Sequence, residues 1–364
     1  MKFICPKERL LSAISQIQGA VSSKTTLPIL ANVLLEAENG VLTFAATDLD
    51  IGIQYKIPAA ITEPGATTLP AKRLFSIIRE LPDGDVDVQV NQNHVAVITC
   101  GVAFFRVVGI GKEEFPKLPE FPESAVYEFP QVLIKEMLNK TSYAVCHDES
   151  RYTLNGVFMV AKSNKITMVA TDGRRLAVIE KHFNLPKGAE FEVIIPSKTI
   201  QELVKILGAE GSVNIVLAKN QIAFRFPNCT LISRLVEGIY PNYKQVIPAG
   251  LEQKISINRE EFLSAVKRST LITNDRSNSI KLNISRNRLV ISANTPDVGE
   301  SRESINVPYD GKDIDVAFNP MYLIDVLRSL EEHEVLLEVT DSANPGIVRT
   351  GAEFLYVIMP MRLS

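Results

Sequence analysis

The stretch VLTFAATD at residues 41–48 recurs as KITMVATD at residues 165–172 and, more loosely, as RLVISANT at residues 288–295. Each copy follows another strand-like run and a turn. Such paired apolar runs separated by turn residues are typical of a β-hairpin. The first turn contains Asn39–Gly40, which is a strong hairpin signal. We therefore expect one hairpin to occur three times along the chain.

Two helix-like segments accompany each copy of the hairpin. Their apolar residues follow the i, i+3, i+4 spacing of amphipathic helices. The earlier segment starts at Pro6, Pro130 and Asn258. Proline suits the first turn of a helix and asparagine suits its N-cap. The later segment starts at Pro70, Pro196 and Asn319.

The spacing of these landmarks predicts three tandem domains. Asp48 and Asp172 are 124 positions apart, which is too long for one unit of a solenoid. Proline-rich linkers at residues 113–124 and 237–250 separate the repeats. We place the domains at 1–124, 125–250 and 251–364, each an α+β domain with two helices packed on antiparallel sheets of six to eight strands in all.

Three similar domains joined by short linkers suggest an arc. Two arcs that close head to tail would make a homodimeric ring of six domains, since closed symmetric assemblies are the norm for oligomers. An open arc or a monomer is the alternative.

The composition is that of an ordinary globular protein. Of 364 residues, 46% are hydrophobic and 22% are charged. No apolar run is long enough to cross a bilayer, and the N-terminus lacks the apolar stretch of a signal peptide. We therefore expect a cytoplasmic protein that does not enter membranes. The net charge of −3 argues against DNA binding by bulk electrostatics.

An enzyme is one alternative that the sequence disfavours. It contains neither a G-x-x-x-x-G-K-[ST] phosphate loop nor an H-E-x-x-H metal motif. The four cysteines lack metal-ligand spacing and suit small buried hydrophobes. The four histidines have no repeated carboxylate or cysteine partner. We expect no catalytic residue, no metal and no cofactor.

Several motifs together resemble one family. They are LPIL (27–30), ATD (46–48), RYTLNG (151–156), ATDGRRLA (170–177), YPNY (240–243) and YVIMPMRL (356–363). In this order they resemble the beta subunit of bacterial DNA polymerase III, the replicative sliding clamp. The resemblance covers essentially the whole chain. The ATDGRRLA segment and the MPMRL terminus are its most specific parts.

The resemblance implies a non-catalytic ring-shaped homodimer that encircles duplex DNA. Helices would line the hole and sheets would form the outside. A clamp loader would open the ring with ATP, and the ring would tether the replicative polymerase and repair proteins. A topological grip needs only a few labile phosphate contacts, because affinity and salt sensitivity both grow with each phosphate neutralised. The acidic net charge is then no obstacle. We expect association with the nucleoid during replication.

The resemblance also implies a pocket for partner peptides between the second and third domains. Apolar and methionine side chains would form an adaptable groove, and Asn319, Arg175 and Arg362 would bind the peptide by hydrogen bonds. Arg174 stands where relatives often carry His, and Gln245 where they often carry Arg, so ligand preference is expected to differ. An ordinary final strand that closes a core is the alternative for MPMRL. The matching positions are Leu154, Thr171, Gly173, Arg174, Arg175, Leu176, Pro241, Val246, Asn319, Tyr322, Val357, Met359, Pro360, Met361 and Arg362.

Basic residues on the repeat helices and on two loops are the candidates for contact with DNA. An aromatic side chain beside a cation, as at Arg151 and Tyr152, can pack on a sugar or a base. A solvated helix face is the alternative for any single lysine or arginine. The DNA-facing candidates are Lys24, Lys72, Arg79, Arg151, Tyr152, Lys198, Lys205, Lys267 and Arg268.

The dimer interface is expected to join the first domain of one copy to the third domain of the other. An apolar centre flanked by opposite charges suits a stable interface. Core positions inside one subunit are the alternative for Ile77 and Leu271. The candidates are Arg73, Ile77, Phe105 and Val107 on one side, and Leu271, Ile272, Glu300 and Glu303 on the other. A protein-interaction scaffold that never encloses DNA is the second functional alternative.

Overall fold

The computed structural model describes residues 1–22, 26–121, 126–185, 190–249, 253–274, 278–296 and 298–362. The chain forms two compact units. Unit 1 comprises Met1–Val132 and Gln201–Leu235, and unit 2 comprises Leu133–Ile200 and Val236–Ser364. Among the described residues, no helix is long and apolar enough to cross a membrane.

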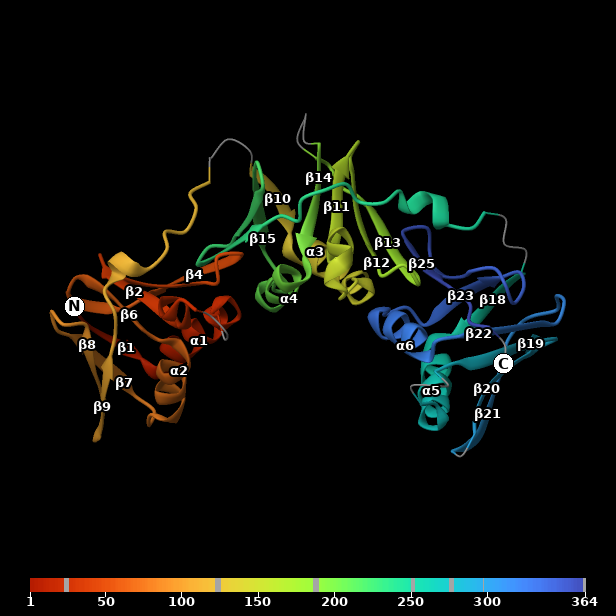
Figure 1. The fold of residues 1–364 in the computed structure, drawn as a ribbon, viewed down its shortest axis with the longest axis horizontal. Helices are drawn as coiled ribbons and strands as arrows, with labels where there is room; N and C mark the ends of the chain where they lie inside the picture. Colours follow the sequence, from red (N-terminus) through yellow and green to blue (C-terminus); the bar gives the residue numbers. More distant parts are fainter. Residues whose placement is uncertain are drawn as a thin grey trace. The chain divides into compact units, whose positions relative to one another are not determined.

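Unit 1 contains a five-stranded sheet in the order β5-β1-β7-β8-β9 and an eight-stranded sheet in the order β10-β15-β16-β17-β4-β3-β2-β6 (Figure 1). All neighbouring strands are antiparallel. The strands are β1 (Lys2–Pro6), β2 (Asn32–Glu38), β3 (Val41–Thr47), β4 (Ile51–Pro58), β5 (Ala60–Glu63), β6 (Gly65–Pro70), β7 (Asp85–Val90), β8 (Val95–Cys100), β9 (Ala103–Val108), β10 (Val126–Pro130), β15 (Ser212–Ala218), β16 (Gln221–Arg225) and β17 (Cys229–Arg234).

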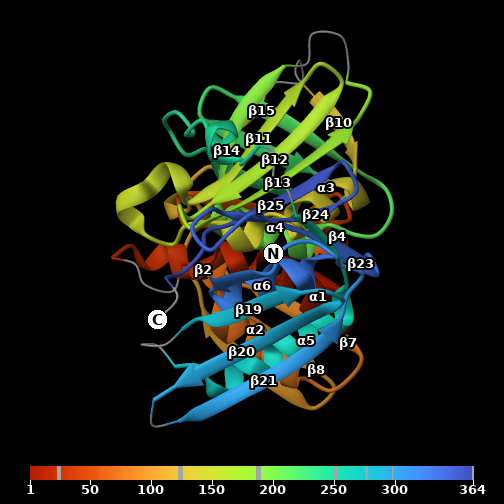
Figure 2. The same cartoon turned by 90° about the vertical axis from the view of Figure 1, so that its right-hand side faces the viewer.

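Unit 2 has the same plan, with an eight-stranded sheet in the order β14-β11-β12-β13-β25-β24-β23-β18 and a four-stranded sheet in the order β21-β20-β19-β22. Figure 2 shows β19, β20 and β21 side by side with α5 behind them. The strands are β11 (Gly156–Lys162), β12 (Lys165–Thr171), β13 (Arg175–His182), β14 (Phe191–Pro196), β18 (Gln253–Asn258), β19 (Ile280–Ser285), β20 (Arg288–Thr295), β21 (Gly299–Asn306), β22 (Ile314–Phe318), β23 (Glu334–Val339), β24 (Gly346–Thr350) and β25 (Phe354–Ile358).

The six predicted helices are all present in the described residues. They are α1 (Lys7–Ile17), α2 (Ala71–Glu80), α3 (Gln131–Asn139), α4 (Ser197–Ile206), α5 (Arg259–Ser269) and α6 (Pro320–Ser329). In Figure 1, α1 and α2 lie together beside the strands of unit 1, as α5 and α6 do in unit 2. Their apolar stripes are buried; on α1 the stripe is Leu10, Ala13, Ile14 and Ile17.

Local sequence signals explain where these elements begin and end. Asn39 (φ 51°) and Gly40 (φ 78°) form the left-handed turn between β2 and β3, as the hairpin signal predicts. Asn258 caps α5 by accepting a hydrogen bond from the Glu261 amide, as predicted. The prediction for Pro6 and Pro130 is wrong by one position, because each proline ends a strand, β1 or β10, and precedes the first helical residue. The described residues of the first repeat also form nine strands, one more than expected.

Strand pairing joins neighbouring repeats into continuous sheets. In unit 1, β4 pairs with β17, so that Ile53 lies opposite Leu231. In unit 2, β13 pairs with β25, so that Leu176 lies opposite Val357. We call these two pairings the first seam and the second seam. Each seam is a backbone hydrogen-bond ladder between two repeats. The second repeat is therefore divided between the two compact units instead of forming a third unit.

The chain segment at residues 112–121, which we call the strap, covers the first seam. Phe115, only 7% exposed, packs with Ile29, Leu30 and Ala45, while Phe121 packs against Val216, Ala223 and Ile232. Leu118 contacts both clusters. A Cβ atom at Gly52 would lie only 2.7 Å from Leu118 Cδ2. Glycine at this position of β4 therefore lets the strap lie close to the sheet.

Candidate functional site

The turn at residues 171–175 is built by two side chains. Thr171 Oγ1 donates to the Arg175 carbonyl (2.6 Å) and accepts from the Gly173 amide (3.0 Å). Asp172 Oδ1 accepts from the amides of Arg174 (2.9 Å) and Arg175 (3.1 Å). Gly173 adopts φ 86°, a left-handed conformation that favours glycine. The repeated sequence Thr-Asp thus encodes a fixed turn at the start of β13.

The same turn occurs in the first repeat. Thr47 Oγ1 donates to the Ile51 carbonyl (2.8 Å), and Asp48 Oδ1 accepts from the amides of Asp50 (3.1 Å) and Ile51 (2.8 Å). Leu49, at φ 81°, takes the place of Gly173. The recurrence gives the ATD motif a structural meaning that does not depend on ligand binding.

The C-terminal segment lies beside this turn. The Met359 amide donates to the Arg174 carbonyl (3.0 Å), and the Met361 amide donates to the Ala317 carbonyl (2.8 Å). The segment is therefore held on one side by the turn and on the other by β22. The side chain of Met359 is 44% exposed, whereas those of Pro360 and Met361 are half-buried.

Helix α6 supplies another part of the same surface. Its first residue is Pro320, and Asn319 caps it by accepting from the Met321 amide (2.9 Å). Tyr322, in the first turn, lies with its ring 4.4 Å from the guanidinium carbon of Arg175. The backbone carbonyl of Tyr322 accepts from Tyr356 Oη (3.0 Å). This helix therefore presents its N-terminal turn to the turn at residues 171–175.

Arg175 connects these elements. Its Nε donates to Asp172 Oδ2 (3.0 Å), its Nη1 to Asp325 Oδ2 (2.6 Å) and its Nη2 to the Tyr143 carbonyl (2.6 Å). Burial opposes the charge of Arg175, but interactions with Tyr356, Asp325 and Asp172 outweigh it and hold its pKa above the usual range. Each guanidinium nitrogen of Arg175 thus donates a hydrogen bond to an acceptor of its own chain, and its predicted role as a donor to a peptide stays a prediction.

The structure separates the predicted pocket residues into two layers. Leu154, Leu176 and Val357 are at most 9% exposed and belong to one buried cluster with Tyr240, so they support the surface rather than form it. Tyr240 stacks on Phe158 with ring centroids 4.7 Å apart. The remaining residues, Arg175 apart, are exposed or half-buried; they are Thr171, Gly173, Arg174, Pro241, Val246, Asn319, Tyr322, Met359, Pro360, Met361 and Arg362.

The predicted DNA-facing residues lie at the surface wherever the structure describes them. Several already pair with acidic neighbours: Arg79 with Glu80, Arg151 with Asp148, Lys205 with Glu202 and Arg268 with Glu303. The exposed pairs Arg79–Glu80 and Arg151–Asp148 are of a kind that contributes little and exchanges readily. Tyr152 is 59% exposed. Lys72, Lys198 and Lys267 are exposed on α2, α4 and α5, and Lys24 lies outside the described residues.

The predicted interface residues are less uniform. Val107 is only 3% exposed, so its assignment to an interface is wrong. Side chains alternate between the two faces of β9, and that of Val107 lies on the face that packs into the core of its own domain. Arg73 and Glu300 are exposed, Ile77 and Ile272 are half-buried, and Leu271 is 77% exposed. The edge strand FFRVV (104–108) was expected to pair across subunits, but Phe104 and Val108, which are 64% and 69% exposed, were not among the named candidates. Both faces of β9 carry apolar residues, so period-two alternation alone does not indicate which face is exposed.

Arg268 and Glu303, predicted for different surfaces, form a bidentate pair with each other. Arg268 Nε donates to Glu303 Oε1 (2.8 Å) and Nη2 to Oε2 (2.7 Å). These hydrogen bonds hold the pKa of Glu303 below its usual range. Neither charge is therefore free in this conformation.

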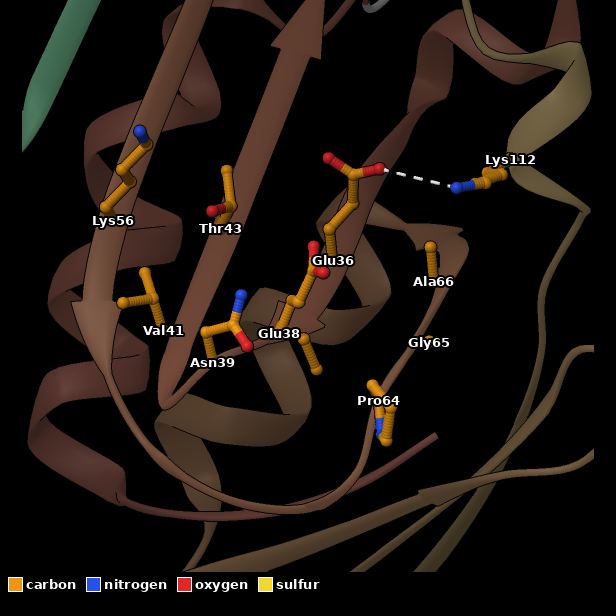
Figure 3. Close-up of a pocket in the computed structure, with 11 residues that line it drawn as sticks. Glu36, Glu38, Asn39, Val41, Thr43, Lys56, Pro64, Gly65, Ala66 and Lys112 are labelled. Carbon is orange, nitrogen blue, oxygen red and sulfur yellow. Dashed lines mark ion pairs between the residues drawn. The ribbon is translucent and has the colours of Figure 1, made fainter.

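A shallow hollow in unit 1 contains none of the predicted site residues. Figure 3 shows its lining, in which Glu36 and Lys112 form an ion pair with 3.8 Å between the charged atoms. The surrounding side chains come from β2, β3, β4 and β6. Its polar character gives no indication of a particular ligand.

Family comparisons cover almost the entire chain. Residues 1–119, 128–242 and 244–362 match the N-terminal, central and C-terminal domains of the DNA polymerase III beta subunit, respectively. The chain belongs to the DNA polymerase III beta subunit family. This beta subunit thus has three clamp domains, while the exact boundaries at 124 and 250 stay predictions.

Relatives agree over their full length. The beta sliding clamp of Chlamydia pneumoniae is 37% identical, over 100% of this chain and 99% of its own. That of Bacillus subtilis is 32% identical over 100% of both chains. The crystal structure of the DNA polymerase sliding clamp from Bacillus subtilis superimposes with a TM-score of 0.96 and covers 100% of both chains. A clamp from Bartonella birtlesii bound to griselimycin is 33% identical, with a TM-score of 0.94 and 100% coverage of both chains. This beta subunit is a DNA sliding clamp and a non-catalytic processivity factor.

Two carboxylates of the site were missed from the sequence. Asp172 was identified only as part of a repeated motif, although its carboxylate accepts the hydrogen bonds that form the turn and also contacts Arg175. Asp325 follows Tyr322 by three positions and so shares its helix face, a signal that could have identified it.

Proposed function

We propose that two copies of this beta subunit close head to tail into a six-domain ring around duplex DNA. The observation that carries the proposal is the exposed apolar surface of strand β9. It forms an edge of its sheet and carries the exposed side chains of Phe104, Phe105 and Val108. An exposed apolar edge is an aggregation hazard unless another strand covers it. Strand β21, an edge of the last sheet, is the expected partner, and the helical turn Thr270–Ile272, which contains Leu271, contacts this strand.

The proposed contact with DNA is weak and independent of sequence. The basic residues on α2, α4 and α5 stand among acidic neighbours, so few phosphates would be neutralised at once. The salt dependence of the contact should be correspondingly shallow. A ring retains DNA by topology and can slide because each contact is easily exchanged.

The proposed partners bind at the surface formed by the turn at residues 171–175, the N-terminal turn of α6 and the C-terminal segment. Exposed apolar groups such as Val246 (56%) and Met359 (44%) suit an adaptable peptide groove. The partners are the replicative polymerase, other clamp-binding proteins and an ATP-dependent clamp loader. The site of action is the cytoplasm, at the nucleoid. By analogy with the Bartonella birtlesii relative, we also expect griselimycin to bind.

Retention on circular and linear DNA tests the ring directly. The protein is loaded onto a nicked circular plasmid with its clamp loader and ATP, the complex is isolated, and the plasmid is then cut once. Loss of protein on cutting, with persistence on the uncut circle, is the expected result. Equal retention on both forms would indicate direct contact binding and would contradict the ring. A scaffold that never encloses DNA would fail to be retained on either form.

Met361→Ala is expected to weaken polymerase binding by about tenfold, a typical effect for a well-packed interface residue. Sedimentation of the variant should remain that of the wild-type protein, because the Met361 amide still donates to Ala317. Deletion of residues 360–364 should have a larger effect of the same kind. Val41→Ala, which is 39% exposed in the other unit, is the control. Unchanged polymerase affinity in Met361→Ala would contradict the assigned surface.

A further inference from the structure

Each of the three guanidinium nitrogens of Arg175 donates a hydrogen bond within unit 2, and this arrangement restricts how the residue can move. The guanidinium donates to Asp172, Asp325 and the Tyr143 carbonyl over distances of 2.6 to 3.0 Å. Its side chain is 10% exposed. Turning these donors toward a ligand would leave partly buried carboxylates unpaired, which is costly.

Asp325 is the second carboxylate that accepts a hydrogen bond from Arg175. It lies on α6, one turn after Tyr322, and its side chain is 29% exposed. Its carboxylate contacts Arg175 Nη1 at 2.6 Å, so α6 is tied to the turn at residues 171–175 by a charge-assisted hydrogen bond. Both elements contribute side chains to the proposed partner surface.

The ring of Tyr322 lies against the same guanidinium. The 4.4 Å separation from the ring centroid is that of a cation–π contact. The Tyr322 carbonyl is held independently by Tyr356 Oη at 3.0 Å. Burial raises the pKa of Tyr356 well above its usual value, so that this phenol remains a neutral donor. Ring and backbone of Tyr322 are thus fixed from two sides.

We propose that Asp325 is a positioning residue for partner binding, and that Arg175 acts on the partner through Asp172, Tyr322 and the turn rather than by donating to it. The bridge Asp172–Arg175–Asp325 sets the separation and orientation of the two walls of the binding surface. A preformed surface binds more tightly because less ordering is required on association. This inference rests on the proposed partner site and adds a residue outside the predicted set.

Asp325→Asn tests the bridge in the full-length dimer. The amide has the volume of the carboxylate but lacks its charge, so the contact with Arg175 weakens. The probe is the purified replicative polymerase catalytic subunit, and affinity is measured by surface plasmon resonance well below the melting temperature. We expect a loss of about five- to tenfold, as for a weakened hydrogen bond to a charged group. Asp315→Asn is the matched control, since Asp315 pairs with Lys281 (2.9 Å) on β19.

The control separates positioning from general stability. Both substitutions remove an ion pair of unit 2, and their melting temperatures are compared by circular dichroism. If only Asp325→Asn lowers affinity, the positioning role is supported. Wild-type affinity in Asp325→Asn, or an equal loss in Asp315→Asn, would overturn it. Absence of polymerase binding by the wild-type protein would instead contradict the proposed function itself.

A double-mutant cycle with Arg175→Met distinguishes bridging from direct donation. Methionine preserves an apolar stem next to Tyr322 but cannot donate hydrogen bonds. If Arg175 and Asp325 act as one bridge, the double variant should bind about as well as the weaker single variant, because interacting residues are non-additive. Losses that add would mean that Arg175 contributes to the partner independently, and would overturn the inference.

Discussion

At the scale of single residues, the charges of this beta subunit are mostly engaged with one another. Asp315 accepts from Lys281 Nζ (2.9 Å) and from Asn283 Nδ2 (2.7 Å) across β19 and β22. These contacts hold the pKa of the Asp315 carboxyl below its usual value. A lowered pKa in the folded state means that folding favours the ionised form, so this residue links stability to pH.

The expected sign follows from that linkage. The contribution of Asp315 should be complete above the ordinary carboxyl pKa of about 3.9 and should disappear as the pH falls through the lower pKa of the folded state. Urea unfolding at pH values from 7 down to 3 should show wild-type protein more stable than Asp315→Asn at neutral pH, with the difference shrinking in acid. A difference that grew in acid would contradict the assignment.

Residue types alone could not predict which charges are available. Arg175 and Arg268 have the same chemistry in the sequence, and both were assigned to external ligands. In the structure Arg175 bridges two carboxylates and Arg268 pairs with Glu303. Their partners lie up to 150 positions away in the chain, so only tertiary structure brings them together. The exposed apolar candidates Leu271 and Met359, by contrast, form no ion pair with a distant residue, so the sequence was enough to select them as surface candidates.

At the scale of elements, repetition made the fold predictable. The helix starts, the hairpins and the Thr-Asp turns follow from local signals, and each was available in more than one copy. The strand pairings that join repeats could not be predicted from local signals, because β4 and β17 are separated by more than a hundred residues. The strap was recognised as a proline-rich linker, but nothing local indicated that Phe115 packs into a core.

The strap should therefore stabilise unit 1. Phe115→Ala is expected to lower the free energy of unfolding by about 3 kcal/mol, because a buried aromatic ring is removed and a cavity is left. Leu49→Ala, at a side chain 46% exposed, is the control and should change it by less than about 1 kcal/mol. Chemical denaturation followed by circular dichroism measures both. Equal effects would show that the strap contributes no more than an exposed loop.

At the scale of the whole molecule, the proposed dimer depends on apolar surface that one chain leaves exposed. Leu271 (77% exposed) and the β9 side chains Phe104 and Val108 are among the most exposed large apolar side chains of the described residues. Burial of such side chains in an interface provides most of its binding energy. In the part of the chain that the structure describes, β9 is an outer strand of the five-stranded sheet and β21 is an outer strand of the four-stranded sheet.

Leu271→Asp should accordingly favour the monomer. A buried, unpaired carboxylate at an interface is expected to weaken dimerisation by at least about 30-fold. Sedimentation equilibrium measures the dissociation constant, and Ile239→Asp, at a side chain 91% exposed, serves as the control. An unchanged dissociation constant for Leu271→Asp would place the interface elsewhere. If Ile239→Asp weakened dimerisation equally, the effect of Leu271→Asp would not be specific to an interface at Leu271.

The two seams have a consequence for how the polypeptide could be divided. Since β4 and β17 are joined by a backbone ladder and covered by the strap, covalent continuity between the first and second repeats contributes little to holding them together. A break in the peptide chain between residues 121 and 126 would leave the ladder and the strap's apolar contacts in place. Two separately synthesised fragments, 1–121 and 126–364, should thus recognise each other and restore the beta subunit as a non-covalent complex.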